Sequence, residues 1–535
     1  MTHIALALLL LMQPPTPWWK HAVVYEIYPR SFQDSNGDGI GDLKGITSRL
    51  DYLHDLGIDA IWLTPCYPSP QVDFGYDISN YESIDPKYGT LADFDELVRE
   101  ARKRGIRILM DMVMNHTSDQ HPWFIESRSS KTNPKRDWYV WRDGKGPGEP
   151  PNNWLSEFGH SAWQYDSTTG QYYYHKFYRQ QPDLNWRNPA VERAMFNVVR
   201  FWLDRGVAGF RLDAITTLFE DPELRDEKVL PGKNAYGDQN EDDARTDNHP
   251  EVHDVLKSLR KVIDSFSGQR VLIGETYLHG PDDLNKMYGA NNDELQLPMD
   301  MQVGLIDTLD AAAFRRRITE SQTLIRGNIP LFVFNNHDIH RSLDRYHPYA
   351  AKIVATILLA SRDAAQMYYG EEIGMKTTPP TRKEDVRDPI GITGWPKEKG
   401  RDGERTPMQW DSTANAGFTT DTPWLPVPPT ADTVNVARET KEPGSLLSWY
   451  RKLIALRKTN TSLREGTNEM LDFDQSNVLA WLRKSEAGTV VVVCNMSAET
   501  KTITLRGALR PILRSDSAAT GRSMPPYAVY IGAVQ

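Results

Sequence analysis

The stretch AMFNVVRFWLDRGVAGFRLD, residues 194–213, contains the unit that decides the fold. Apolar residues recur in its first half at intervals of three and four, which predicts an amphipathic helix with one buried face. They are Met195, Val198, Val199, Trp202 and Leu203. The run GFRLD at 209–213 follows and is typical of a short buried strand. A helix that leads directly into a buried strand is the repeating unit of a parallel sheet.

The same alternation of strands and helices covers most of the chain. Strands are predicted at 22–28, 60–64, 107–113, 209–213, 271–275, 297–301, 330–336 and 365–369. Eight parallel strands that alternate with helices close into a (β/α)8 barrel, the TIM barrel. An open doubly wound sheet is the alternative, but no glycine-rich phosphate-binding turn follows the first strand.

Two long segments interrupt the predicted barrel, which comprises residues 18–112 and 186–460. Residues 113–185 are rich in Trp, Tyr, Asn and Pro and are too long for an ordinary connection. They are predicted to form an inserted domain over the barrel mouth. Residues 374–422 are rich in Pro, Gly and Arg, follow the eighth strand on the same side, and are expected to wall the same pocket.

The pattern changes near the C-terminus. In residues 461–535, strand-like runs follow one another without helices between them. They lie at 478–482, 490–494, 502–505 and 528–531. This segment is predicted to be a small antiparallel β-domain.

Composition excludes several classes of protein. Of 535 residues, 62 are Lys or Arg and 72 are Asp or Glu, giving a net charge of −10. This balance leaves no basic excess to neutralise a phosphate backbone, so no nucleic-acid partner is expected. The two cysteines, Cys66 and Cys494, cannot make a disulfide framework and are interpreted as buried small hydrophobic residues.

Residues 1–17 precede the patterned region as an apolar extension. The apolar run at 4–12 is well short of the roughly 20 residues that span a bilayer, so no membrane partner is expected. Its position resembles the apolar part of a secretory signal, which favours a secreted or periplasmic location. A cytoplasmic protein is the alternative, because residues 1–3 lack a firm positive charge and no small-x-small cleavage site precedes Pro14.

Three predicted strand ends carry carboxylates, namely Asp213, Glu275 and Asp338. In a barrel of this kind, side chains at the C-terminal strand ends converge on one cavity. Two carboxyl groups about 5 to 5.5 Å apart are what retaining glycoside hydrolysis requires, one as nucleophile and the other as acid and base. Arg211 lies two residues before Asp213 and projects to the same side of the strand, where it is expected to keep Asp213 ionised. Asp213 is therefore the better candidate for the nucleophile.

Four motifs in order resemble the conserved regions of the α-amylase superfamily, glycoside hydrolase family 13. They are DMVMNH at 111–116, GFRLD at 209–213, GET at 274–276 and NNHD at 335–338. In addition, QPDLN at 181–185 resembles the signature of its oligo-1,6-glucosidase and α-glucosidase branch. The resemblance extends from Trp18 to the C-terminus and implies a glycosidase with a (β/α)8 barrel.

The resemblance also implies residue roles. Asp213 would be the nucleophile, Glu275 the general acid and base, and Asp338 the carboxylate that grips sugar hydroxyls in the transition state. Among the implied substrate contacts, Tyr76 would stack under the terminal glucose, and Asp73 and Arg405 would bind its far hydroxyls and close the pocket end. The residues that would hydrogen-bond the same ring are His116, Arg211, Gln181 and His337. Phe158 and Phe177 would line the entrance of the pocket.

The loop DSNGDGIGD at 34–42 places oxygen-bearing residues at alternating positions, as a calcium loop does. It is not a complete EF-hand, because the twelfth position is Gly45 and a strand precedes the loop. In the branch that the chain resembles, this loop binds a structural calcium or magnesium ion. The implied ligands are Asp34, Asn36, Asp38, the Ile40 carbonyl and Asp42.

These observations predict a retaining exo-acting α-glucosidase that releases terminal non-reducing α-D-glucose from short oligosaccharides and can also transfer it. Ala214, next to the proposed nucleophile, favours α-1,4 links such as those of maltose and maltooligosaccharides. Among relatives of this branch, Val at this place is typical of α-1,6 specificity and Thr or Ala of α-1,4 specificity. The predicted partner is a small oligosaccharide, and the oligomeric state stays open.

Two alternatives remain. Trehalose synthase is the first, because NHTSDQHPWF at 115–124 also resembles that relative, although NNWLSEFGHSAW at 152–163 is more similar to glucosidases. The second is a non-catalytic carbohydrate-binding or transport-ancillary protein of the same fold. Such relatives typically lose catalytic carboxylates and carry a membrane helix, whereas this sequence retains Asp213, Glu275 and Asp338.

Overall fold

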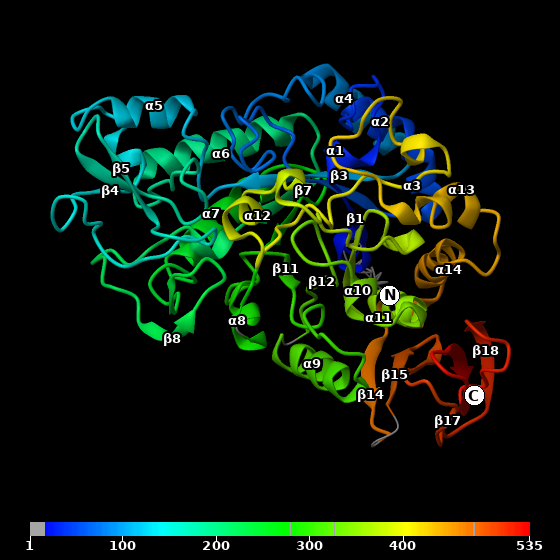
Figure 1. Ribbon diagram of the computed structural model, residues 1–535. Helices are drawn as coiled ribbons and strands as arrows, with labels where there is room; N and C mark the ends of the chain where they lie inside the picture. Colours follow the sequence, from blue (N-terminus) through cyan, green and yellow to red (C-terminus); the bar gives the residue numbers. More distant parts are fainter. Residues whose placement is uncertain (1–15, 279, 326, 474–476) are drawn as a thin grey trace, which may run out of the picture.

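The computed structural model describes residues 16–278, 280–325, 327–473 and 477–535, so most of the predicted extension at 1–17 lies outside the described residues. Eight parallel strands form a closed barrel at the centre of the molecule (Figure 1). In chain order they are β1 (Val23–Ile27), β2 (Ala60–Leu63), β3 (Arg107–Val113), β7 (Gly209–Asp213), β10 (Val271–Gly274), β11 (Leu297–Asp300), β12 (Leu331–Phe332) and β13 (Ala364–Tyr368). Each lies where the sequence predicts a strand, and the predicted TIM barrel is confirmed.

Helices surround the barrel. Those between or after its strands are α1 (Pro29–Phe32), α2 (Leu43–Ser48), α3 (Leu50–Leu56), α4 (Leu91–Lys103), α6 (Pro189–Asp204), α7 (Val252–Asp264), α8 (Pro281–Lys286), α9 (Ala311–Leu324), α10 (Ser342–Arg345), α11 (Ala351–Ala360), α12 (Pro389–Gly394), α13 (Val436–Glu439) and α14 (Leu446–Thr459). Helix α6 shows why they form where they do. The Asn188 side chain caps its first turn by accepting the Ala190 N–H, and Pro189 supplies the fixed φ of the first position. The face of α6 predicted from the apolar spacing is buried.

The core has two layers that follow the alternation of side chains along each strand. In β1, Val23, Tyr25 and Ile27 pack in the layer between barrel and helices. Val24, which points the other way, belongs to a separate cluster with Trp62 and other residues inside the barrel. Because inward positions near the C-terminal strand ends carry polar residues instead, the inside of the barrel becomes polar where the site begins.

Segment 113–185 forms a three-stranded antiparallel sheet beside the barrel (Figure 1), together with α5 (Pro122–Ser129). Its strands are β4 (Trp141–Arg142), β5 (Trp163–Asp166) and β6 (Gln171–Tyr174), in the order β4-β6-β5. Aromatic residues give it a core of its own, which includes Trp154, Trp163 and Tyr174. A hairpin that the sequence analysis missed, β8 (Val229–Lys233) with β9 (Gln239–Glu241), lies between β7 and α7.

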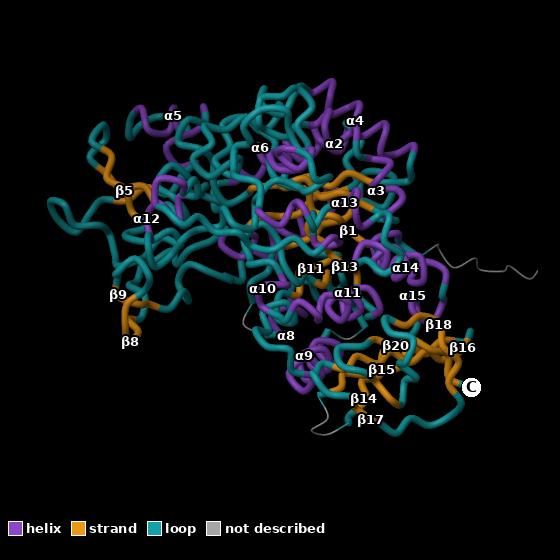
Figure 2. Tube along the Cα trace, turned by 45° about the vertical axis from the view of Figure 1, so that its right-hand side comes forward, coloured by secondary structure: helices purple, strands orange, loops and turns teal. Residues whose placement is uncertain are grey.

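The C-terminal segment forms a five-stranded antiparallel sheet (Figure 2) after the short helix α15 (Thr461–Glu465). In spatial order its strands are β14 (Thr467–Leu471), β15 (Val478–Ser485), β16 (Gly488–Asn495), β20 (Val529–Val534) and β18 (Leu509–Arg514). The strand predicted at 502–505 is wrong in extent. Only Thr502 belongs to a strand, β17 (Lys501–Thr502), which pairs separately with β19 (Ser523–Met524).

Cys66 and Cys494 are both free and buried, as predicted. No helix within the described ranges has both the length and the apolar character of a membrane span.

Candidate active site

A cavity of about 540 Å³ lies at the C-terminal ends of the barrel strands. It brings together all but two of the predicted catalytic and substrate-binding residues: Asp73, Tyr76, His116, Phe158, Phe177, Gln181, Asp213, Ala214, Glu275, His337 and Asp338. Arg211 and Arg405 do not line it but contact residues that do. Ile390, Gly400 and Arg401 also line it, so segment 374–422 walls the same pocket, as predicted.

Asp213 and Glu275 share one guanidinium group. Arg211 Nη1 donates to Asp213 Oδ1 at 2.6 Å and to Asp111 Oδ1 at 3.0 Å, while its Nη2 pairs with Glu275. Arg211 is fully buried beneath the cavity, and Asp213 and Glu275 are each 7% exposed. The two carboxylates therefore lie side by side over one fixed positive charge.

The protonation of this pair departs from the sequence-based expectation. Burial raises the pKa of Asp213 to about 7, although the charge of Arg211 acts in the opposite direction. Burial likewise raises the pKa of Glu275 to about 7, again against Arg211. The expected contact between Arg211 and Asp213 is present, but the guanidinium only offsets part of the desolvation and does not lower the pKa of Asp213 below its ordinary value.

The backbone at the end of β7 links the two carboxylates a second time. Ala214 has a left-handed conformation, with φ 42° and ψ 41°, and it begins the short turn Ile215–Thr217. Its N–H donates to Glu275 Oε2 at 2.8 Å. Ala214 also lines the cavity, so its methyl group borders the space beside the proposed nucleophile.

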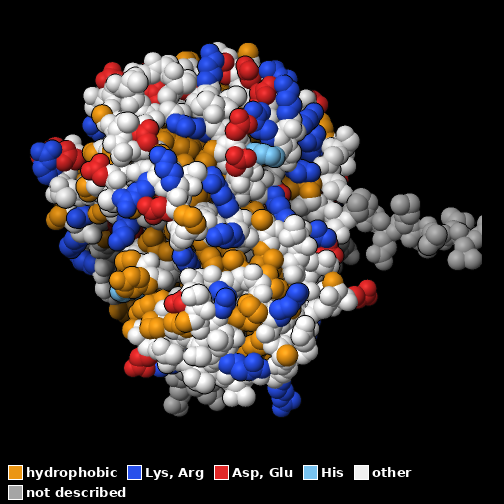
Figure 3. Space-filling view, turned by 90° about the vertical axis from the view of Figure 1, so that its right-hand side faces the viewer, with side chains coloured by type: hydrophobic (Ala, Val, Ile, Leu, Met, Phe, Trp, Pro, Cys, Tyr) orange, Lys and Arg blue, Asp and Glu red, His pale blue; other side chains and the backbone are white. Residues whose placement is uncertain are grey.

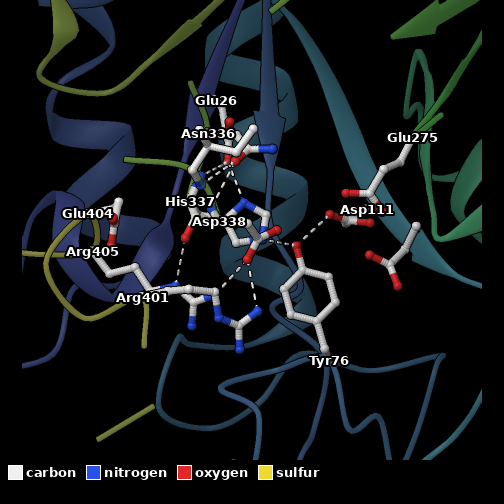
Figure 4. A network of polar contacts seen from close by, with 12 residues as sticks. Glu26, Tyr76, Asp111, Glu275, Asn336, His337, Asp338, Arg401, Glu404 and Arg405 are labelled. Carbon is white, nitrogen blue, oxygen red and sulfur yellow. Dashed lines mark hydrogen bonds and ion pairs between the residues drawn. The ribbon is translucent and has the colours of Figure 1, made fainter. Parts of the chain in front are cut away.

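A chain of buried polar groups supports the opposite wall (Figure 4). Glu26 Oε1 lies 2.6 Å from His337 Nδ1, and His337 Nε2 lies 2.7 Å from the Tyr76 hydroxyl. That hydroxyl also donates to Asp111 Oδ2 at 3.0 Å. The rings of Tyr76 and His337 are nearly parallel, with centroids 5.3 Å apart. Burial lowers the pKa of His337 well below its ordinary value, so this imidazole is neutral near pH 7.

Two arginines close the end of the pocket around Asp338. Arg401 Nη1 and Arg405 Nη2 each donate to Asp338 Oδ1 at 2.9 Å. Burial would raise the pKa of Asp338, but the charges of Arg401 and Arg405 outweigh it and hold that pKa below its ordinary value. The partner of Asp73 is Arg401, at 2.7 Å, whereas Arg405 bonds Asp338 and the His337 carbonyl. The pocket end that the resemblance assigns to Asp73 and Arg405 therefore has Arg401 as the arginine that contacts Asp73.

The remaining predicted residues form the rim nearest to the inserted segment. Gln181 Nε2 donates to Asp73 Oδ2 at 3.0 Å and lies 3.2 Å from His116 Nε2. The His116 ring contacts Phe177, and Phe177 contacts Phe158, in tilted and edge-on geometries. Burial lowers the pKa of His116 to about 3, so this ring is neutral and can accept as well as donate a hydrogen bond.

Sequence reasoning assigned no role to several residues that build this site. They are Glu26, Asp111, Tyr277, Asp388 and Arg401. Asp111 and Tyr277 could have been found, because they belong to or directly follow the quoted motifs at strand ends. Glu26 could have been found from the alternation of β1, which turns it toward the barrel interior. Asp388 and Arg401 lie in an irregular segment, where no periodicity reports the direction of a side chain.

The loop at 34–42 has part of the arrangement expected of a calcium loop. Gly37 and Gly39 have φ near 80°, and the Asp34 carboxylate accepts three backbone N–H groups of the loop, from Asn36, Gly37 and Gly39. Asp34 also accepts the Thr419 hydroxyl at 2.5 Å. Within the described part of the chain, however, no three acidic, His or Cys side chains gather as metal ligands would. The backbone therefore fits a cation loop while the ligand cluster is not assembled, and calcium binding stays a prediction.

Comparison with known proteins agrees with this geometry. The model of the alpha-amylase catalytic domain matches residues 26–466. A probable alpha-glucosidase of Rhizobium meliloti (strain 1021) is 43% identical over 519 residues, covering 92% of each chain. An oligo-1,6-glucosidase of Parageobacillus thermoglucosidasius is 41% identical, covering 90% of this chain and 91% of the relative.

The fold also matches a solved structure of an alpha-glucosyl transfer enzyme, XgtA. The TM-score is 0.90 at 38% identity, and the match covers 97% of this chain and all of the other. The family model spans most of the chain, and both relatives are similar over nearly their full length. The chain therefore belongs to the α-amylase family of glycoside hydrolases, glycoside hydrolase family 13, in its α-glucosidase branch.

Proposed function

We propose that the protein is a retaining exo-acting α-glucosidase that releases terminal α-D-glucose from short α-glucosides. The observation that carries this proposal is the pair Asp213 and Glu275, which share Arg211 at the bottom of a cavity closed at one end by Asp73 and Arg401. Because one guanidinium contacts both carboxyl groups, they lie close together, as in retaining glycosidases. In inverting glycosidases the two carboxyl groups are farther apart, which leaves room for a water molecule between them and the sugar.

In the first step, Asp213 attacks the anomeric carbon of the terminal glucose while the bond to the leaving oxygen breaks. Glu275 gives its proton to that oxygen, so the aglycone departs as a neutral alcohol and a glucosyl ester forms on Asp213. In the second step, the ionised Glu275 takes a proton from water, which attacks the same carbon and frees Asp213. Because each step inverts the configuration at the anomeric carbon, the released glucose retains the original α configuration. The raised pKa of Glu275 suits a group that must carry a proton near neutral pH.

Asp338 and its neighbours would bind the sugar ring. Its lowered pKa keeps this carboxylate charged, so it can accept hydrogen bonds from sugar hydroxyls and favour the positive charge that develops on the ring. His337, held by Glu26, and Tyr76 form the neighbouring wall. These interactions strengthen when the ring flattens toward the oxocarbenium-like state.

The closed end of the pocket supports exo action. Arg401 bridges Asp73, Asp338 and Asp388 with Nη–Oδ distances between 2.7 and 2.9 Å. These groups come from three segments of the chain and form a fixed wall at one end of the cavity. A chain that continued beyond the non-reducing end would meet this cluster of ion pairs.

The linkage preference is proposed from Ala214, whose small side chain borders the cavity beside Asp213. A branched side chain here would occupy space that a 4-linked glucose needs, and one or two methyl groups of mismatch are worth about 1 to 3 kcal/mol. We therefore propose a preference for maltose and maltooligosaccharides. Transfer of glucose to a second sugar in place of water is a further expected reaction, and the similarity to the alpha-glucosyl transfer enzyme supports it.

One assay tests the proposal. The protein is incubated separately with maltose, isomaltose, sucrose and trehalose, and products and anomers are followed by proton NMR. The expected result is α-glucose as the first product, fastest from maltose. Accumulation of trehalose from maltose would identify a trehalose synthase instead, and absence of turnover with all four sugars would favour a non-catalytic relative.

Two further predictions complete the proposal. Asp34, Asn36, Asp38, the Ile40 carbonyl and Asp42 would hold a calcium or magnesium ion, which would give structural support to the loop. No catalytic step depends on that ion. The secreted or periplasmic location predicted from residues 1–17 also stays a prediction, because that segment lies almost wholly outside the described residues.

A further inference from the structure

A second groove, of about 560 Å³, lies where the barrel meets the C-terminal sheet. One side is formed by the start of α11 and the turn before it, with Tyr349 and Lys352, and the other by loops of the C-terminal sheet, with Ser515, Asp516 and Tyr527. It shares no lining residue with the catalytic cavity. The groove is therefore a separate feature that the proposed reaction does not use.

Three aromatic rings gather beside this groove. His347 and Tyr527 are parallel within 2°, with centroids 5.4 Å apart, and Tyr349 lies 4.7 Å from His347. Tyr349 is nevertheless 70% exposed, the highest value among the exposed large hydrophobic residues of the described chain. A ring face held in place by stacking and left open to water is a preformed surface for another flat apolar face.

The backbone holds one of these rings at an energetic cost. Tyr527 has φ 53°, in the left-handed region that bulky residues rarely adopt. Its N–H donates to the Ser497 carbonyl at 3.2 Å, which fixes this turn against the neighbouring loop. Tyr527 is half-buried and packs against the layer between barrel and helices, and its strained backbone holds the ring against His347 and Tyr349.

Polar groups along the groove complement the rings. Ser515 Oγ accepts the Val529 N–H at 2.8 Å, and its hydroxyl hydrogen makes no bond among the described residues. Asp516 is exposed beside it, and Lys352 stands on the opposite side with its ammonium on the Gly444 carbonyl. Ring faces combined with hydrogen-bonding groups suit a ligand that has both C–H faces and hydroxyls, which describes a sugar.

The size of the patch argues against a protein partner. The other exposed large hydrophobic residues of the described chain lie in separate elements, and only Ile512, 36% exposed, belongs to the same C-terminal sheet. On the face that carries this sheet, hydrophobic side chains are interrupted by Lys and Arg (Figure 3). A stable interface buries about 800 Å² per partner with a continuous apolar centre, which this surface does not offer.

We propose that this groove, lined by Tyr349 and Tyr527 with His347 stacked against both rings, is a second carbohydrate site that binds an α-1,4-glucan chain by stacking glucose rings on Tyr349. The choice of α-glucan rests on the proposed function. The site would hold the chain and leave the reaction to the catalytic cavity. His347 follows Asp338 by nine residues, and both lie in the connection after β12, at the end of the barrel where the cavity opens. A chain bound here would contact the same connection between β12 and β13 that carries Asp338.

β-Cyclodextrin tests this site, because it is a closed ring of α-1,4-linked glucose without a non-reducing end and cannot enter an exo-acting pocket. Binding to the full-length protein is measured by isothermal titration calorimetry and by saturation-transfer NMR. We expect the wild type to bind it, Tyr349→Ala to bind at least about tenfold more weakly, and Tyr349→Phe to bind like the wild type. Tyr165→Ala is the matched control, since Tyr165 is 50% exposed but lies in the inserted segment.

The outcomes separate this proposal from the proposed function. Tyr349→Ala should leave kcat/KM for maltose unchanged, because Tyr349 lies outside the catalytic cavity. No binding by the wild type, or equal binding by Tyr349→Ala, overturns the second site whatever the protein does to maltose. Binding that is lost in Tyr349→Ala supports the site even if the four-sugar assay shows another reaction. A change of sedimentation coefficient in Tyr349→Ala without cyclodextrin binding would identify a self-association surface and overturn the proposal.

Discussion

The backbone N–H of Ala214 donates a hydrogen bond to Glu275 Oε2 at 2.8 Å. The residue that follows the proposed nucleophile therefore holds the proposed acid and base through the main chain. No substitution at position 214 other than proline removes this donor, so the side chain there can vary with substrate preference while the spacing of the two carboxylates is retained.

We predict that Asp213→Ala and Glu275→Gln each lower kcat for maltose by several orders of magnitude. Removing the nucleophile abolishes the glucosyl ester, and removing the acid leaves the aglycone to depart as an alkoxide. Steady-state assays and thermal melts of both variants check this. Glu398→Gln is the control, because Glu398 lines the same cavity without touching Arg211, and it should keep most activity. More than a few per cent residual activity in either variant would contradict the mechanism.

The pH dependence of stability should report the raised pKa of Glu275. Its pKa is about 7 in the folded protein against about 4.5 when unfolded. The folded state therefore binds the proton more tightly, and this contribution is present below about pH 4.5 and lost as pH rises toward 7 and above. Glu275→Gln has no such titration. The melting temperature of this variant minus that of the wild type should therefore increase as the pH is raised from 5 to 8. A constant difference across this range would show that the pKa is not raised.

The pH–rate profile follows from the same pair. Turnover needs Asp213 ionised and Glu275 protonated, and burial raises both pKa values to about 7. Because the two groups lie against one guanidinium, the profile of kcat/KM should be a narrow bell with apparent pKa values that belong to the pair. In Glu275→Gln the alkaline limb should disappear. A broad plateau in the wild type would contradict this account.

Ala214→Val should shift the preference from maltose toward isomaltose, by about 10 to 200-fold in the ratio of kcat/KM values. Because Ala214 has a left-handed backbone, a β-branched side chain will also cost stability, by about 1 to 2 kcal/mol. The ratio between the two sugars is therefore the informative quantity. Ala214→Gly is the control that relieves the strain and adds no side chain. An unchanged ratio in Ala214→Val would remove the assignment.

Arg401→Ala should raise KM for maltose more than it lowers kcat, because it loosens Asp73 and Asp338 without touching the reacting carboxylates. It should also permit slow cleavage of maltooligosaccharides blocked at the non-reducing end, since the pocket wall is opened. Arg401→Lys retains the charge but cannot bridge three carboxylates. Its KM for maltose should therefore lie between those of the wild type and Arg401→Ala. Equal activity of the wild type and Arg401→Ala on both substrates would contradict the proposed wall.

Calcium should raise the melting temperature of a sample freed of metal by a chelator. Asp34 bonds Thr419, so a metal in loop 34–42 would also steady the segment that carries Arg401. Asp38→Ala should lower the effect of added calcium, because Asp38 is a proposed ligand whose loss leaves the Asp34–Thr419 contact in place. A melting curve that does not respond to calcium in the wild type would exclude the site.

How much of this structure is readable from sequence depends on periodicity. The barrel was predictable because strands such as β7 are fully buried and the helices between them show one apolar face. β14 and β18 were missed because they are largely exposed and have no regular apolar spacing. In the site, strand-end motifs located Asp213, Glu275 and Asp338, whereas Arg401 acts from an irregular loop and Glu26 only through His337. The raised pKa of Asp213 depends on burial, which sequence does not report.

The contact between Arg401 and Asp73 spans 328 positions of the chain. During synthesis the ribosome therefore completes β1 to β13 and much of segment 374–422 before the pocket end can form, and a nascent chain that stops earlier has the nucleophile without the wall. Contacts between such distant residues are also among the slowest to form. The wall that selects terminal glucose is therefore completed later in synthesis than the barrel strands that carry Asp213 and Glu275.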